Sequence, residues 1–126
     1  MQGRLLKVVK WLFILALAVA LPMATISFAK GKTDLSPAAK SGKKLFDQNC
    51  TMCHFANQTA NKIGPGLKGL FKNKELPYSH RPVTVANVQE QIEKGNQKGK
   101  PMPMPPFGSK FSKTQINDLV AYLKTL

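Results

Sequence analysis

The chain's only two cysteines lie three residues apart, and a histidine follows the second of them directly. The segment from Cys50 to His54 reads C-x-x-C-H, which is the attachment motif of a c-type haem. Thiols at this spacing can each form a thioether with one of the two haem vinyl groups, and His54 can then bind the iron as its proximal axial ligand. The motif therefore predicts one covalent haem c, held by Cys50 and Cys53, which any fold of this chain must enclose.

Three other functions of a cysteine pair fit the rest of the sequence less well. A disulfide redox motif follows a strand in a βαβ setting, whereas a lysine-rich helical pattern precedes Cys50. A zinc site needs four ligands, and the only other histidine is His80, alone and 26 residues further on. A structural disulfide is compatible with an oxidising compartment but leaves the adjacent His54 without a role. Haem attachment accounts for all three residues of the motif.

The first 29 residues have the layout of an export signal. A short basic region precedes an unbroken apolar run of 11 residues at positions 11–21, and Ser27-Phe28-Ala29 then gives a small-x-small pattern before Lys30. We expect residues 1–29 to be a signal peptide that is cleaved after Ala29. Residues 30–126 would then form one domain in the periplasm or elsewhere outside the cytoplasm.

A retained membrane anchor is the alternative for this segment. Positions 11–29 are long enough to be considered, but Pro22, Thr25 and Ser27 dilute them, and a spanning helix needs about 20 apolar residues. The basic start places the remainder of the chain outside the cytoplasm under either interpretation. Membrane association is expected only if the segment is retained.

The charge of the chain is strongly positive. Nineteen basic residues face six acidic ones, for a formal net charge of +13, and removal of residues 1–29 leaves +10. All basic residues after position 29 are lysines except Arg81. Nucleic-acid recognition favours arginine, whereas diffuse lysine charge suits brief docking on an acidic protein. We therefore expect redox partners with acidic docking surfaces, and no nucleic acid.

Helix caps and apolar periodicity predict the first two helices. Ser36 before Pro37 is typical of a helix start, and this helix should run to about Gln48. Thr84 can cap a second helix that ends at Gly95. The apolar side of this second helix is expected to consist of Val85, Val88 and Ile92.

A third helix has the clearest pattern, because Ser112 and Gln115 form a capping box in front of it. Its apolar residues repeat at i, i+3, i+4 and i+7 as Ile116, Leu119, Val120 and Leu123. A short helical turn is expected at Leu70 and Phe71. No alternating strand pattern is present, so the fold class predicted is all-α with long loops around the haem.

The proline-rich segment 98–109 offers two candidates for the distal iron ligand. Its two methionines, Met102 and Met104, stand between prolines, which lower the entropy cost of holding a loop over a ring. Thioethers are soft ligands, and we favour Met104, with Met102 as the alternative. Met52 lies inside the attachment motif and is interpreted as a spacer. His80 is the other possible ligand, but its surroundings are typical of a surface turn.

With these residues in hand, the chain resembles class I monohaem cytochromes c of the bacterial short-chain type, related to cytochromes c6 and c5. The resemblance covers residues 37–126. In that family a helix with the pattern G-x-x-x-F/Y-x-x-x-C precedes the haem motif, and Gly42, Phe46 and Cys50 match it. The last helix of the family crosses the first near that glycine through a leucine and an aromatic residue, which Leu119 and Tyr122 match. The resemblance implies the cytochrome c fold.

Two loops carry the resemblance further. The segment from Gly64 to Leu67 is similar to the family's G-P-x-L, which implies that the Pro65 carbonyl accepts a hydrogen bond from His54. The segment that begins at Met104 matches M-P-x-F, which supports Met104 as the distal ligand. Positions 72–81 match no motif.

The resemblance implies an exported carrier of single electrons for a respiratory chain, and not an enzyme. Two alternatives stay open: an electron-transfer subunit of a larger membrane oxidoreductase complex, and a haem-based sensor whose methionine yields to a gas. In the family, electrons leave through the haem edge near the thioethers and the methionine loop. The lysines that flank these loops, and are expected to ring that edge, are Lys62, Lys68, Lys98, Lys100 and Lys110.

Overall fold

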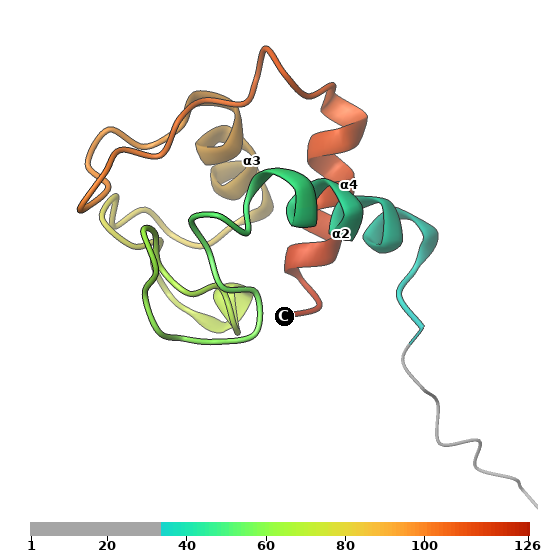
Figure 1. The fold of residues 1–126 in the computed structure, drawn as a ribbon, viewed down its shortest axis with the longest axis horizontal. Helices are drawn as coiled ribbons and strands as arrows, with labels where there is room; N and C mark the ends of the chain where they lie inside the picture. Colours follow the sequence, from blue (N-terminus) through green and yellow to red (C-terminus); the bar gives the residue numbers. More distant parts are fainter. Residues whose placement is uncertain (1–33) are drawn as a thin grey trace, which may run out of the picture. The chain divides into compact units, whose positions relative to one another are not determined.

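The structure, a computed structural model, describes residues 34–126. Within this range the only regular elements are helical, and the two β-bridges are isolated residue pairs. The elements are α2 (Pro37–Asn49), the 3-10 turn η1 (Leu70–Lys72), α3 (Val85–Lys94) and α4 (Lys113–Leu123), as Figure 1 shows. The all-α prediction is confirmed. None of the helices in this range is both long and apolar enough to span a membrane. The predicted signal peptide, residues 1–29, lies outside the described residues and stays a prediction.

The first and last helices begin at the predicted caps. The Ser36 hydroxyl accepts the Ala39 N–H at 3.2 Å, and Pro37 takes the first helical position, where no N–H is needed. At the start of α4, Ser112 and Gln115 exchange side-chain and backbone hydrogen bonds in a complete capping box. Both helices therefore begin where residues next to one another in the sequence satisfy the first backbone N–H groups.

Helix α3 differs from its prediction at one position. Thr84 caps it by accepting a first-turn N–H at 3.1 Å, and it ends at Gly95, whose φ of 72° suits glycine. Val88 and Ile92 are buried as expected, but Val85 is 37% exposed. Val85 is the first residue of the helix and lies beyond the edge of the core. Its spacing of three residues from Val88 and seven from Ile92 therefore overestimated its burial.

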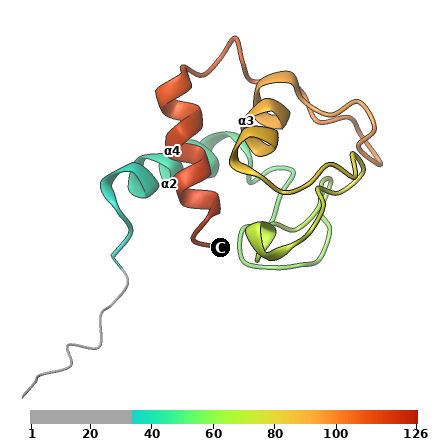
Figure 2. The same cartoon turned by 180° about the vertical axis from the view of Figure 1, so that it is seen from behind.

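Helices α2 and α4 cross, and both views show the crossing (Figures 1 and 2). They approach most closely at Gly42, where any side-chain carbon would overlap the backbone carbonyl of Asp118. Next to the crossing, the rings of Phe46 and Tyr122 pack edge to face with centroids 5.4 Å apart. The crossing implied by the resemblance is therefore present, with glycine required for contact between the two backbones.

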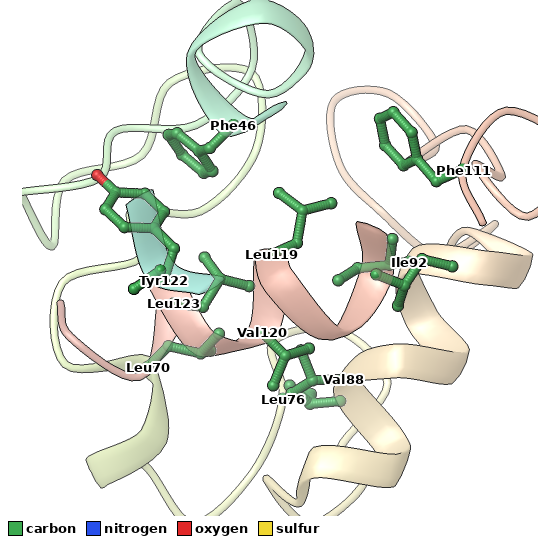
Figure 3. Packing of buried hydrophobic residues seen from close by; sticks show 12 residues of the cluster. Phe46, Leu70, Leu76, Val88, Ile92, Phe111, Leu119, Val120, Tyr122 and Leu123 are labelled. Carbon is green, nitrogen blue, oxygen red and sulfur yellow. The ribbon is translucent and has the colours of Figure 1, made fainter. Parts of the chain in front are cut away.

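Helix α4 supplies the centre of the apolar core, which Figure 3 shows. Phe46 and Leu119 are the largest fully enclosed side chains. Leu70 of η1 and Val88 of α3 pack around them. Truncation of Phe46 to alanine would cost about 3–5 kcal/mol, the usual range for a buried aromatic residue.

Candidate cofactor pocket

A cavity of about 300 Å³ lies between the helices and three loops, within the size range of small-molecule and cofactor sites. Its walls come from the C-terminal end of α2, from α3 and α4, and from the loops at positions 50–69, 73–84 and 95–112. The lining is predominantly apolar. It includes all the predicted site residues, namely Cys50, Cys53, His54, Pro65, Met102 and Met104.

The two cysteines lie on one turn at the end of α2. Cys50 is the C-cap of the helix, and its carbonyl accepts the N–H groups of Cys53 at 3.0 Å and His54 at 2.8 Å. Both thiols are free and partly buried. This tight turn presents both thiols and the imidazole to the same cavity, which is the arrangement that two-point attachment of one planar group requires.

The surroundings of Cys50 are unlike those of a redox-active cysteine. The pKa of the Cys50 thiol is raised to about 11, first by burial and then by the neighbouring Cys53, while Lys110 opposes the shift. Reactive cysteines instead lie in electropositive surroundings that lower the pKa. Cys50 therefore lacks the environment of a reactive thiol in a dithiol redox motif.

A hydrogen bond to the backbone of Pro65 fixes the orientation of the His54 ring. Its Nδ1 lies 2.8 Å from the Pro65 carbonyl oxygen, which can only accept, so Nδ1 carries the proton and donates. The lone pair of Nε2 is then available to a metal ion. A side-chain carbon at Gly64 would lie 2.5 Å from Cε1 of His54, so glycine is needed for the loop to pass this close to the ring.

The methionine loop, which covers positions 95–112 between α3 and α4, is fixed to the end of α3. Asn96 and Met104 exchange backbone hydrogen bonds, both of 3.0 Å. Beside this pair, a side chain at Gly95 would overlap the Met104 carbonyl. Further along, the Phe107 N–H donates to the Ile92 carbonyl at 2.9 Å. The loop therefore packs closely along α3 on both sides of its exposed tip.

The three methionines of the site differ in exposure. Met104 is half-buried and packs against the core, whereas Met102 is 60% exposed. Met52 is 74% exposed, in keeping with its interpretation as a spacer. His80 lies outside the cavity lining and has Glu75 as a neighbour at 3.3 Å. Among these candidates, Met104 is the side chain best held for a ligand's role.

The chemistry of these residues fits a covalent haem. Two thiols are free to form thioethers, an oriented imidazole and a thioether line the same space, and leucine and phenylalanine side chains make up much of the wall. Within residues 34–126, no group of three or more His, Cys, Asp or Glu side chains could hold a bare metal ion. The thiols, the imidazole and the thioether together suit the iron of a covalently attached haem.

Three of the five predicted lysines lie at the cavity or against its immediate surroundings. Lys100 lines the cavity itself. The Lys62 ammonium donates to the Thr51 carbonyl, inside the attachment motif, at 2.7 Å. The Lys110 ammonium lies 5.9 Å from the rings of Phe107 and Phe111, which both line the cavity.

The other two lysines differ from each other. Lys98 is exposed in the methionine loop, two residues from Lys100. Lys68 instead lines a separate hollow together with Lys72 and Leu126. Within the described range, none of the five predicted lysines is paired with a carboxylate.

Sequence reasoning missed one wall of the cavity. Leu76, Pro77 and Tyr78 line it, although positions 72–81 match no motif. The apolar cluster Leu-Pro-Tyr in a lysine-rich surrounding was the available signal. Gln91 and Asn96 also line the cavity and were not predicted, because polar residues in a helix and a loop carry no periodic signal.

Comparison with known proteins gives consistent matches. A family described as Cytochrome c matches residues 39–126. Cytochrome c of Gibberella zeae is 34% identical over 96 residues, which cover 68% of this chain and 91% of that protein. Cytochrome c of Cochliobolus lunatus is 43% identical over 56 residues, covering 44% and 52%. Cytochrome c2 of Rhodospirillum rubrum is 29% identical over 124 residues, covering 82% and 91%.

Proposed function

This chain belongs to the cytochrome c family, whose members carry electrons through covalent haem c, and from that premise we propose that it is an exported single-electron carrier with a His/Met-ligated iron. In this proposal Cys50 and Cys53 form the two thioethers, and the Pro65 carbonyl orients His54. His54 and Met104 would be the two protein ligands of the iron. With both ligands in place no substrate would bind the iron, so the protein would be a carrier and not an enzyme.

One observation carries the proposal. The imidazole of His54, oriented by a 2.8 Å hydrogen bond, lines the same apolar cavity as Met104, whose backbone N–H and carbonyl both form hydrogen bonds with Asn96. Bound haem supplies an iron that gains and loses one electron. The Nδ1–H of His54 donates to the Pro65 carbonyl, which would leave the lone pair of Nε2 free to bind that iron. The Asn96 pair holds Met104 in place, and the apolar lining keeps water out.

The partners in this proposal are redox proteins with acidic docking surfaces. Lys98, Lys100 and Lys110 lie in or next to the loop that carries Met104, and none of them has a carboxylate partner within the described range. Such charges speed the encounter of two proteins without adding much buried contact. The alternative, a subunit of a larger membrane oxidoreductase complex, uses the same chemistry. A pull-down of this protein from a membrane extract separates the two. Recovery without other subunits would favour the free carrier.

Export to the periplasm is the remaining part of the proposal. It rests on the basic region, the apolar run and Ser27-Phe28-Ala29 at positions 1–29. The amino-terminal sequence of the protein purified from the periplasm should begin at Lys30. A chain that begins at Met1 in the membrane fraction would contradict cleavage and favour a retained anchor.

The axial assignment is tested by two matched variants. Met104→Ala should abolish the sulfur-to-iron charge-transfer band of the ferric protein and lower its potential, because a thioether favours ferrous iron. Met102→Ala is the control two residues away and should leave the band in place. The opposite pattern would make Met102 the ligand, and a band unchanged in both variants would refute methionine ligation from this loop.

A further inference from the structure

The loop at positions 73–84, which matches no sequence motif, forms a firmly built wall of the cavity. Leu76 is buried in the core, and its backbone N–H donates to the Arg81 carbonyl at 2.8 Å. Glu75 and Pro82 form an isolated antiparallel bridge, and the Val83 N–H donates to the Lys74 carbonyl at 3.0 Å. The loop is therefore closed at its base like a short hairpin (Figure 1, yellow).

The same loop is tied to α3 by a charged group. The Arg81 guanidinium donates to both Asn87 and Glu90 on that helix. Glu90 also accepts from Lys94 at 2.9 Å, and the hydrogen bonds from Lys94 and then Arg81 lower the pKa of the Glu90 carboxyl to about 2. The loop thus lies fixed against the helix whose C-terminal end carries the methionine loop.

The tip of the loop has an uncommon backbone. Tyr78 and His80 have φ values of 64° and 54°, in the left-handed region that side chains other than glycine rarely adopt. Such conformations persist where the surrounding structure determines them, and they concentrate at functional positions. Here the base of the loop and its attachment to α3 hold the tip, so the direction of the Tyr78 side chain is fixed.

The phenol of Tyr78 reaches the methionine loop. Its Oη lies 3.1 Å from the Lys100 carbonyl, to which it can donate across 22 positions of sequence. Tyr78 and Lys100 both line the cavity. In the described part of the chain, this is the one hydrogen bond that joins positions 97–103 to anything outside the methionine loop. The other hydrogen bonds of positions 97–103 go to Asn96 within the loop, whose base is held by the Asn96 and Met104 pair and by the bond from Phe107 to Ile92.

We propose that Tyr78 is a positioning residue: by donating to the Lys100 carbonyl it holds the tip of the methionine loop over the cavity and so keeps Met104 on the iron. The inference rests on the proposed role of Met104 as axial ligand. Loss of the hydrogen bond frees the tip, and opening of the loop exposes the distal side of the iron to small ligands. Tyr78 itself does not touch the iron.

The test removes one hydroxyl group with Tyr78→Phe in the intact, haem-loaded protein. The affinity of the ferric iron for added imidazole should rise about two- to tenfold, the range that follows from the net value of one hydrogen bond. Hydrogen exchange of the Met104 amide, which donates to Asn96, should accelerate by a similar factor. Tyr122→Phe makes the same chemical change at the chain's other tyrosine, in the helix core, and should leave both measurements unchanged.

Unchanged imidazole affinity and unchanged Met104 amide exchange in Tyr78→Phe would overturn the proposal. A changed potential without either effect would also overturn it, because the hydroxyl would then act on the haem and not on the loop. Failure of the axial assignment is recognised separately, by a charge-transfer band that survives Met104→Ala. Amide exchange in Tyr78→Phe reports on the loop whichever residue binds the iron.

Discussion

Substitution of Gly64 by alanine is the sharpest perturbation of the proximal side, because the new methyl group is directed at the histidine. Its carbon would lie 2.5 Å from Cε1 and 2.9 Å from Nδ1 of His54, closer than packed atoms allow. The ring must move, and the 2.8 Å hydrogen bond to Pro65 is then lost. Overpacking costs about 1–3 kcal/mol, and the lost hydrogen bond costs about 0.5–1.5 kcal/mol. We expect a total loss of stability of about 1.5–4.5 kcal/mol.

The potential should change together with the stability. Donation from Nδ1 to a carbonyl makes the imidazole more basic, which favours ferric iron, so the Gly64→Ala protein should have a raised potential. Denaturant unfolding measures the first effect, and a redox titration followed by absorbance measures the second. Gly69→Ala is the control: its φ of 71° makes alanine unfavourable, but the space around it is open, so it should cost stability without moving the potential. A Gly64→Ala protein with wild-type stability and potential would refute this account of the proximal loop.

Two further predictions concern charge. Replacing Lys98, Lys100 and Lys110 together by Glu should slow second-order electron transfer to an acidic partner and leave the absorption spectrum unchanged. Because screening shortens the range of electrostatic attraction to about 8 Å at physiological ionic strength, the wild-type rate should fall steeply with added salt. Stopped-flow rates that change neither with salt nor with the triple substitution would contradict the docking proposal. The second prediction follows from the pKa of Glu90, which is lowered to about 2 by its two cationic partners and therefore stabilises the fold above its ordinary pKa near 4.5. Glu90→Gln should be less stable than wild type at neutral pH, and only slightly so, because the ion pairs of Glu90 with Arg81 and Lys94 are partly exposed and screened. The urea midpoints of the two proteins should converge as pH falls from 4.5 to about 2. A difference in midpoint that persists below pH 2 would refute this role of Glu90.

Local signals in the sequence predicted the helices well. The Ser112 and Gln115 capping box, the Ser36 cap and the stop at Gly95 all appear in the structure, because each depends on neighbours within four residues. The contact between Gly42 and the last helix joins distant residues. It followed only from the family resemblance, since one glycine in a helix carries no information about its partner.

The parts of the site that escaped prediction depend on contacts between loops. Tyr78 reaches the methionine loop through a backbone with positive φ, which no periodic pattern indicates. Proximity along the chain was also a poor guide for Lys68, which follows the haem motif closely but lies in a separate hollow. The motif itself was decisive because its chemistry is local: Cys50, Cys53 and His54 meet on a single turn.

The mass of the denatured protein tests the central claim most directly. If Cys50 and Cys53 hold a haem through two thioethers, the unfolded chain must keep it, and its mass must exceed that of the polypeptide by one haem. The same haem should stay with the chain in acidified organic solvent. A chain that releases its haem there and returns to the mass of the polypeptide would contradict covalent attachment at this motif.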